Sequence, residues 1–346
     1  MLTFSTFVTG LQEPIAQWIA EDGHRPRQIL DGAILYDARK EKRTLPCFFN
    51  TFNVLDFEKR SGSKAVEQLM RGVLQRGFRL PDTSHSKRSR GSFRVVTSHE
   101  NQLVAVDKRL RSDVEKLIAS RTGMIPDRRG GGREFWFLAR SEGVVLFMER
   151  QQAKNEKNEQ KLKKGELRPQ LAYCLNRLAQ PIPEDIMVDP FCGYGAITRA
   201  RAAYFPYREI YGLDIDGQKI KALQQQLQRP GVSKKLVNSI TAKNFINPIN
   251  YQRADIRQLS AIFPAQSVDV IITDPPWGVF DTQDDIPSLY ENLAKVCKHV
   301  IKPDGRMVIL TAQKEQLQKW QPDARYDILV SGQKAAVFVF TYVNAD

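Results

Sequence analysis

The second half of the chain alternates short apolar runs with amphipathic stretches, and this alternation limits the possible folds more than any other feature. Ile186–Val188, Ile210–Leu213 and Val268–Thr273 predict buried strands, and the intervening Ala196–Tyr204 and Gln218–Gln228 carry apolar residues at helical spacing. Strands that alternate with helices over short connections form a parallel sheet covered on both faces. Such sheets bind ligands at the carboxyl ends of their strands.

The remaining elements of this half extend the same pattern. Leu167–Leu178 and Ile286–Val300 are predicted helices, because their apolar residues recur every three or four positions. The further predicted strands are Tyr251–Ala254, Met307–Thr311, Tyr326–Val330 and Ala336–Tyr342. The last two strands follow each other without an intervening helix, which predicts an antiparallel pair. We therefore expect an α/β domain with a seven-stranded, mostly parallel sheet.

The first half has a different organisation. Its predicted helices, Phe7–Ala20, Ala65–Gln75 and Ser112–Ser120, are separated by strand-like segments, a pattern typical of α+β folds with antiparallel sheets. The strand-like segments are Ile29–Tyr36, Leu45–Asn53, Ser92–Thr97, Gln102–Val106, Glu134–Ala139 and Gly143–Met148. This spacing favours two small modules rather than one.

One polar segment marks the main domain boundary. Residues 153–165, AKNEKNEQKLKKG, are charged and lack apolar periodicity, which is typical of a linker or a solvated helix. We predict a first module over residues 1–80, a second over 81–152 and the α/β domain over 166–346.

The positive charge of the chain is concentrated in its first half. The formal net charge is +13 at pH 7, and residues 1–165 hold 31 Lys and Arg against 20 Asp and Glu, a net charge of +11. A polyanion such as RNA or DNA explains this asymmetry, although a solvated basic surface would also produce it. Two basic segments, 84–91 and 126–133, supply the predicted RNA-binding residues Lys87, Arg88, Arg90, Arg128, Arg129 and Arg133. The alternative for each segment is a basic loop without a ligand.

Other features narrow the class of protein. No apolar run approaches the ~20 residues that span a bilayer, and the N-terminus has no basic stretch before an apolar core, so we expect neither a membrane partner nor a signal peptide. The four cysteines form no CxxC pair and the four histidines show no ligand spacing. We therefore expect no metal site and a reducing, cytoplasmic location.

A glycine-rich turn follows the first strand of the α/β domain. In VDPFCGYG, residues 188–195, Gly193 and Gly195 let the backbone turn sharply and approach a ligand closely. Thr198 stands where a dinucleotide-binding motif has its third glycine, which argues against NAD. Asp189, at the strand end, suits a positively charged ligand better than a pyrophosphate.

Further acids follow the next strands. Asp214 ends the predicted strand at Ile210–Leu213 and can accept hydrogen bonds from both hydroxyls of a ribose. Asp255 stands beside Ile256, so the two can hold an adenine by its amino group and its face. The alternative for each acid alone is a helix N-cap. Three acids after successive strands favour a binding site.

The sequence TDPPWG ends the strand Val268–Thr273. Pro275 and Pro276 have no N–H, so the strand cannot continue through them. One interpretation is a rigid turn with Trp277 in the core. The other is a stiff ledge that holds a carboxylate, Asp274, and an aromatic ring beside a planar substrate.

These motifs together resemble a known family. The chain from Leu167 to Tyr342 is similar to class I S-adenosylmethionine-dependent methyltransferases, which have a Rossmann-like fold. VDPFCGYG resembles their glycine-rich motif, GLDID the ribose-binding acid, RADI the adenine-binding acid, and TDPPWG the catalytic motif of enzymes that methylate amino groups of nucleic acids. The resemblance implies S-adenosylmethionine as cofactor, bound by Arg168, Pro169, Asp189, Phe191, Gly193, Gly195, Ala196, Asp214, Ile215, Asp255 and Ile256.

The resemblance extends into the first half of the chain. Leu167-Arg168-Pro169 is similar to the opening of guanine-N2 methyltransferases that carry a THUMP domain. TGLQEPIAQWI, residues 9–19, resembles the start of their ferredoxin-like domain, and residues 92–150 resemble THUMP. The resemblance therefore implies a structured RNA as partner, with tRNA as the first expectation.

The catalytic motif has a chemical interpretation. An exocyclic amine is a poor nucleophile because its lone pair is delocalised into the base. Asp274 and the carbonyl of Pro275 can accept its two hydrogens, and Pro276 stiffens the turn that aims these acceptors. Trp277 can stack on an extruded base. This transfer needs no metal, and Cys192 in the glycine-rich turn is expected to be structural rather than a nucleophile.

Several alternatives stay open at the level of the sequence. The substrate can be rRNA instead of tRNA, or the amino group of adenine or cytosine in DNA, and a non-catalytic RNA-binding protein would carry the same motifs. We expect a monomer, and a small activator subunit is not ruled out by the sequence. Residues 229–250 have no predicted role.

Overall fold

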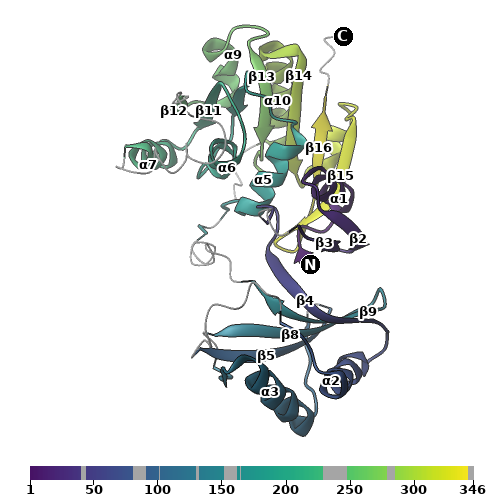
Figure 1. Cartoon of the computed structure of the whole chain (residues 1–346). Helices are drawn as coiled ribbons and strands as arrows, with labels where there is room; N and C mark the ends of the chain where they lie inside the picture. Colours follow the sequence, from purple (N-terminus) through teal and green to yellow (C-terminus); the bar gives the residue numbers. More distant parts are fainter. Residues whose placement is uncertain are drawn as a thin grey trace. The chain divides into compact units, whose positions relative to one another are not determined.

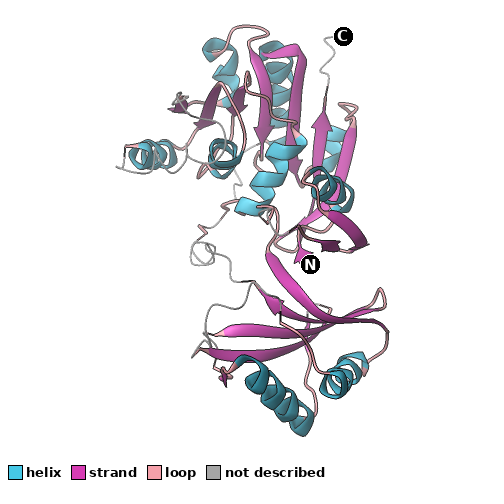
Figure 2. Ribbon diagram, viewed as in Figure 1, coloured by secondary structure: helices cyan, strands magenta, loops and turns pink. Residues whose placement is uncertain are grey.

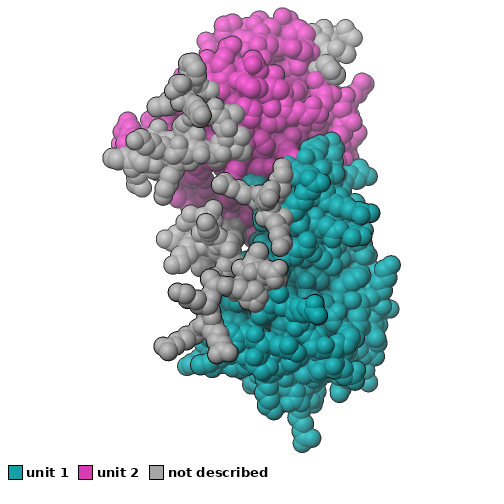
Figure 3. Space-filling model, viewed as in Figure 1, with its two compact units in different colours: residues 1–7, 12–156 teal, residues 8–11, 157–346 magenta. Residues whose placement is uncertain are grey.

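The chain folds into two compact units. The computed structural model describes residues 1–39, 44–80, 91–100, 102–129, 132–151, 162–163, 165–228, 248–278 and 285–341. The first unit comprises residues 1–7 and 12–156, and the second comprises residues 8–11 and 157–346 (Figure 3). The division after residue 156 falls within the predicted linker, most of which lies outside the described residues. Most of the segment 229–250 lies outside them as well.

The first unit is built on one nine-stranded sheet. Its strands are β1 (Leu2–Thr6), β2 (Arg25–Leu30), β3 (Ala33–Asp37), β4 (Asn50–Lys59), β5 (Ser92–His99), β6 (Gln102–Leu103), β7 (Ile125–Pro126), β8 (Arg133–Arg140) and β9 (Val144–Arg150). Their order is β2-β3-β1-β4-β9-β8-β5-β6, and β7 pairs with β5. Strand β4 pairs with β1 near its start and with β9 over most of its length (Figure 1). The two predicted modules therefore share one continuous sheet.

Three helices accompany this sheet: α1 (Gln12–Glu21), α2 (Ala65–Arg76) and α3 (Lys108–Thr122). Helices α2 and α3 lie on the same side of β5 and β8 (Figure 2). They bury Leu69 and Ile118 in one core with Phe93, Phe135 and Phe147. Each such side chain stabilises the fold by about 1.5–3 kcal/mol. The packing thus joins α2 to the second module, whereas the sequence had suggested a boundary between residues 80 and 81.

Several elements of the first unit differ from the sequence prediction. The strand predicted at Leu45–Asn53 begins only at Asn50, as β4, and runs on to Lys59. A glycine explains each of two other differences. The single strand predicted at Ile29–Tyr36 is instead the hairpin of β2 and β3, because Gly32 adopts a φ of +65° that reverses the chain. The helix predicted from Phe7 begins only at Gln12, after Gly10 with a φ of +100°. Helical spacing alone does not detect such left-handed positions.

The second unit contains the predicted seven-stranded sheet. Its strands are β10 (Ile186–Asp189), β11 (Glu209–Asp214), β12 (Ile249–Arg253), β13 (Val268–Thr273), β14 (Ile301–Thr311), β15 (Ala324–Val330) and β16 (Gln333–Phe340). The order is β12-β11-β10-β13-β14-β16-β15. The first five strands in this order are parallel, and β16 is antiparallel to both β14 and β15. The α/β prediction, including the antiparallel pair, is confirmed.

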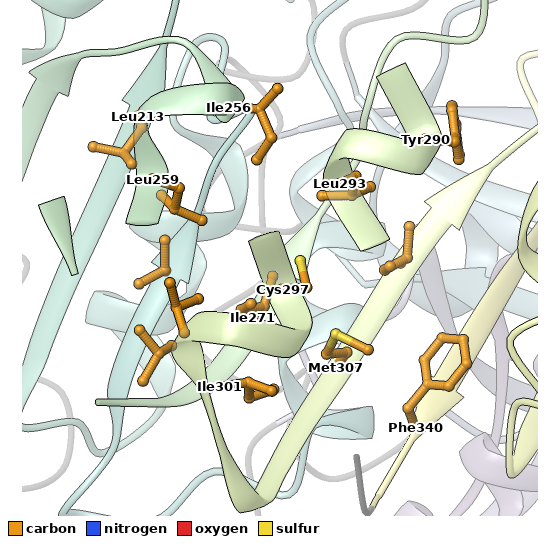
Figure 4. Packing of buried hydrophobic residues seen from close by; sticks show 14 of the residues in the cluster. Leu213, Ile256, Leu259, Ile271, Tyr290, Leu293, Cys297, Ile301, Met307 and Phe340 are labelled. Carbon is orange, nitrogen blue, oxygen red and sulfur yellow. The ribbon is translucent and has the colours of Figure 1, made fainter. Parts of the chain in front are cut away.

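Helices connect these strands. They are α5 (Pro169–Leu178), α6 (Ala196–Tyr204), α7 (Gly217–Leu227), α9 (Leu259–Ile262), α10 (Ile286–Val300), α11 (Lys314–Gln318) and the 3₁₀ helix η2 (Ile256–Gln258). Helix α10 places Tyr290, Leu293 and Cys297 over Ile271 of β13 and Met307 of β14 (Figure 4). This packing fixes the start of α10 beside the end of β13. Within the described residues, no helix combines the length and the apolar character needed to cross a bilayer.

Candidate active site

Three acidic side chains meet at the carboxyl edge of the seven-stranded sheet. Asp189 is the last residue of β10, Asp214 is the last residue of β11, and Asp274 directly follows β13. The three strands are parallel neighbours, so their carboxyl ends lie at one edge. All three acids line a single cavity of about 610 Å³.

The wall of this cavity is strongly acidic. Among the described residues, it contains seven carboxylates and two cations: Glu166, Asp189, Asp214, Asp216, Asp255, Asp274 and Asp285 against Lys219 and Arg257. Asp189, Asp214 and Asp274 form no salt bridge with any described residue. A cavity with such an excess of negative charge favours a ligand that carries positive charge.

The glycine-rich turn is held against the neighbouring strand. The backbone N–H of Cys192 donates to the carbonyl of Leu213 at 2.8 Å, and the N–H of Gly193 donates to Oδ2 of Asp214 at 2.8 Å. The other oxygen of Asp214 accepts from the N–H of Asp216 at 2.8 Å. Gly193 has a φ of +53°, which glycine adopts without strain. These bonds fix the Asp214 carboxylate at the wall, where it can receive hydroxyl donors.

Asp189 is buried with an unused acceptor. Its Oδ1 accepts from the hydroxyl of Thr273 at 2.8 Å and from the N–H of Phe191 at 3.2 Å. Its Oδ2 has no hydrogen-bond partner among the described residues. Burial raises the pKa of Asp189 to about 8, against these two hydrogen bonds and with a contribution from the charges of Asp274 and Asp214. A cationic ligand would supply the positively charged partner that Asp189 lacks.

Asp274 and Trp277 form the proline-stiffened end of β13. The indole Nε1 donates to Oδ1 of Asp274 at 2.9 Å, and both residues line the cavity. Burial raises the pKa of Asp274 to about 7, and the hydrogen bond from Trp277 opposes this rise. The aromatic ring is therefore at the cavity wall rather than in the core, and it is fixed to the carboxylate.

An apolar surface lies beside Asp214 in the cavity wall. Ile215 is 61% exposed although it is a large apolar side chain, and Ile256 lies across the same cavity. Asp255 caps η2 and is paired with Arg257, which lowers the pKa of the Asp255 carboxyl. Asp255 is therefore a helix cap that also lines the cavity, and its role toward an adenine stays a prediction.

Some predicted site residues do not reach the wall. Arg168 and Pro169 begin α5, Gly195 caps α6, and Pro275 is buried behind the turn. A Cβ built on Gly195 would meet Leu223 at 2.8 Å, so this glycine serves helix packing. Of the two acceptors predicted in this turn, Asp274 lines the cavity and Pro275 does not, and the role of each stays a prediction. Phe191, Gly193, Ala196 and Pro276 line the cavity as predicted.

Several wall residues were not among the predicted site residues, although Tyr194 lies within the glycine-rich motif. Tyr194 lies under two cations, with Nζ of Lys163 4.3 Å and Nζ of Lys219 5.7 Å from its ring centroid. Ser288 and Asn292 line the cavity from the first turns of α10. Their spacing of four residues on a helix that follows the TDPPWG turn was the available signal.

Cys192 is a buried thiol in the glycine-rich turn, and it lines the cavity. Burial together with the charges of Asp189 and Asp214 raises the pKa of Cys192 above its usual range. Burial therefore favours the protonated thiol, and the structural role expected for Cys192 stays a prediction.

The predicted RNA-binding arginines differ from one another. Arg133 pairs with the buried Glu149, and Arg128 donates to Glu115 at 2.9 Å. Arg129 has a side chain that is 95% exposed, with its nearest partner, Asp127, 3.6 Å away. Lys87, Arg88 and Arg90 lie outside the described residues. Among the described candidates, Arg129 offers the most accessible charge.

Comparison with known proteins assigns the second unit. Residues 157–328 match the family model described as RMKL-like, methyltransferase domain. Residues 157–328 therefore form a domain of this methyltransferase family. This domain contains the acidic cavity and the TDPPWG turn.

Similar proteins carry names from RNA modification. Over 161 residues the chain is 29% identical to a protein of Thermus thermophilus named tRNA (guanine(6)-N2)-methyltransferase, covering 46% of this chain and 43% of that protein. It is 27% identical over 148 residues to a protein of Methanothermococcus thermolithotrophicus named probable tRNA (guanine(10)-N2)-dimethyltransferase, covering 42% of this chain and 82% of that protein. The chain thus spans less than half the length of the first of these relatives.

The solved structure of TrmN from Thermus thermophilus has the same fold. It matches 99% of both chains with a TM-score of 0.75 at 20% identity. The likeness covers both units, so the N-terminal unit and the methyltransferase domain each have a known architecture.

Proposed function

We propose that the protein is an RNA methyltransferase that transfers a methyl group from S-adenosylmethionine to the N2 amine of a guanosine in tRNA. The observation that carries the proposal is the pairing of Asp274 and Trp277 at the wall of an acidic cavity. The relatives named as tRNA guanine-N2 methyltransferases support the choice of base and RNA.

The donor fits the cavity by charge and shape. S-adenosylmethionine supplies an electrophilic methyl group on a sulfonium, and it also carries an ammonium group, a ribose and an adenine. The unpartnered Oδ2 of Asp189 and the surrounding carboxylates suit its positive charges. Asp214 suits the ribose hydroxyls, and the exposed Ile215 with Ile256 suits the adenine ring.

The acceptor amine is held by the turn after β13. Asp274 accepts a hydrogen bond from the amine, which directs the nitrogen lone pair away from the carboxylate, and later receives the proton that the amine loses. Trp277 offers its ring to the base, an interaction worth roughly 1–3 kcal/mol at other base-stacking sites. Because prolines restrict the backbone, these groups stay aimed without reorganisation.

The first unit is the proposed RNA-binding part. Its net positive charge and the exposed Arg129 suit a phosphate backbone, which structured RNAs present to proteins. The proposal includes a ferredoxin-like module over residues 1–80, a THUMP-like module over residues 81–152 and a monomeric state. The four cysteines, all within the described residues, are buried and form no disulfide, which suits a reducing compartment, so we also propose a cytoplasmic location.

A transfer assay with labelled S-adenosylmethionine tests the proposal. Separate pools of tRNA, rRNA and DNA are offered to the wild type, to Asp274→Ala and to Asp304→Ala, which changes an exposed aspartate outside the cavity. We expect label only in tRNA, as N2-methylguanosine by nucleoside mass spectrometry, with the wild type and the Asp304 variant.

Each other outcome has a defined meaning. Label in rRNA or in DNA would replace the proposed substrate, and absence of label with measurable cofactor binding by calorimetry would favour a non-catalytic RNA-binding protein. Full activity of Asp274→Ala would overturn the role given to this carboxylate.

A further inference from the structure

The turn after β13 cannot hold itself by backbone hydrogen bonds. Pro275 and Pro276 have no N–H, so two of the donors that normally close a turn are missing. Gly278 adopts a φ of +78°, a left-handed conformation that favours glycine. The carbonyls of Pro276 and Trp277 therefore need donors from elsewhere in the fold if the turn is to stay in one position.

One donor comes from Gln313, the residue that precedes α11. The side-chain Nε2 of Gln313 donates to the carbonyl of Trp277 at 2.6 Å. Gln313 is itself fixed, because its backbone N–H donates to the hydroxyl oxygen of Thr311 at 2.8 Å. Thr311 is fully buried as the last residue of β14. The amide of Gln313 is thus a rigid support for the residue that carries the indole.

A second donor comes from α10. The hydroxyl of Tyr290 lies 2.5 Å from that of Thr311 and 3.5 Å from the carbonyl of Pro276. Tyr290 is 1% exposed and packs into the core between α10 and the sheet (Figure 4). Thr311 is therefore the point at which the contacts from Gln313 and Tyr290 meet.

We propose that Gln313, supported by Tyr290, is a positioning residue that holds the Trp277 turn through its backbone carbonyls. The expected effect on catalytic rate rests on the proposed function. Gln313 does not line the cavity, so it acts through Trp277 and not on the substrate. Neither residue belongs to a motif recognised in the sequence.

Loss of this support has a consequence for Asp274. The hydrogen bond from Trp277 Nε1 opposes the effect of burial on the pKa of Asp274. If the turn loosens, this bond weakens and the pKa of Asp274 rises. The other titratable groups that act on this region are Asp189, from β10, and Tyr290, from α10. Both remain unchanged in a Gln313 variant.

Three single substitutions of glutamine residues test the proposal. Gln313→Met keeps the length of the side chain but removes the donor, Gln313→Lys keeps a donor, and Gln316→Met makes the same change on α11 away from the turn. For Gln313→Met we expect kcat to fall about tenfold, the Kd for S-adenosylmethionine to stay within twofold and the acid limb of the pH–rate profile to move to higher pH. Gln313→Lys should recover part of kcat, and Gln316→Met should match the wild type.

A readout without turnover separates this inference from the proposed function. The indole N–H resonance of Trp277 in ¹⁵N-labelled protein should shift and exchange faster with solvent in Gln313→Met, and to a smaller extent in Tyr290→Phe. If the wild type methylates no nucleic acid but these resonances change, the positioning role stands and the proposed function fails. If the resonance and the pH profile of Gln313→Met equal those of the wild type, the positioning role is wrong.

Discussion

The sheet of the first unit and the acidic cavity of the second unit hold their carboxylates in different ways, although the second unit also pairs one buried carboxylate, Asp185, with Arg201 away from the cavity. In the first unit, Glu134 is held by Trp136 and Arg94, and these hydrogen bonds lower its pKa although burial acts in the other direction. Glu149 is buried beside Arg133, which offsets part of the burial. At the cavity of the second unit, Asp189 is buried and Asp274 is half-buried, and neither pairs with a cation among the described residues.

This difference separates structural charges from functional ones. A buried carboxylate with a guanidinium partner stabilises its surroundings only when both groups are present. A buried carboxylate without a partner costs stability in the unliganded protein, and a ligand that brings positive charge removes this cost. Binding a cation would therefore stabilise the acidic cavity. In the sheet of the first unit, Arg133 is already paired with Glu149, so its charge gives no comparable gain on binding an anion.

The most direct test of this difference is to remove the negative charge of Asp274. Asp274→Asn keeps the shape and an oxygen that can accept from Trp277, but loses the negative charge. We expect methyl transfer to fall by a factor of about 10³, while cofactor affinity changes by less than about fivefold. Single-turnover kinetics and calorimetry measure the two quantities. Equal losses in both would show that Asp274 serves binding and not transfer.

Removing a structural charge should instead lower stability. Arg133→Met leaves Glu149 buried without its cation, and we expect the free energy of unfolding of the first unit to fall by about 2–4 kcal/mol. Chemical denaturation measures it, with Arg129→Met as the matched control because that side chain is 95% exposed. A loss below 0.5 kcal/mol for Arg133→Met would mean that the pair is not structural.

The unpaired carboxylate also predicts the sign of a pH effect on stability. Because burial raises the pKa of Asp274 to about 7, the fold favours its neutral form. Its contribution is fully favourable below the ordinary carboxyl pKa of about 4 and is lost as the pH rises through 7. Asp274→Asn should therefore be more stable than the wild type at pH 8, by on the order of 1–3 kcal/mol.

Thermal unfolding without cofactor checks this sign. The difference in Tm between Asp274→Asn and the wild type should shrink as the pH falls from 8 towards 4. A difference that stays constant over this range would show that the carboxylate is not destabilising in the folded protein.

The smallest expected effect concerns RNA contact. Arg129→Ala should weaken tRNA binding by about two- to fivefold and reduce the slope of log affinity against log salt by about one. Filter binding between 50 and 200 mM salt measures both, with Lys319→Ala in the second unit as the control. An effect of Lys319→Ala equal to that of Arg129→Ala would show that the exposed arginine has no special role.

Much of the fold follows from local pattern. The order of strands and helices from residue 167 onward is set by apolar spacing, and the acids Asp189, Asp214 and Asp274 follow strands whose ends meet at one edge. The hairpin at Gly32 was missed because a positive φ leaves no apolar signal. The shared sheet of the first unit was missed because strand pairing between β4 and β9 joins residues about a hundred positions apart.

The sequence by itself determined which chemical groups stand at each strand end, because side-chain period and turn chemistry act over a few residues. Only the tertiary structure decided which charges remain free, since Arg133 and Arg129 look alike until Glu149 is placed beside one of them. It also decided that Gln313 supports a turn 36 residues away. Partners of this kind depend on the packing of β14 and α10 around the turn, which no short stretch of sequence contains.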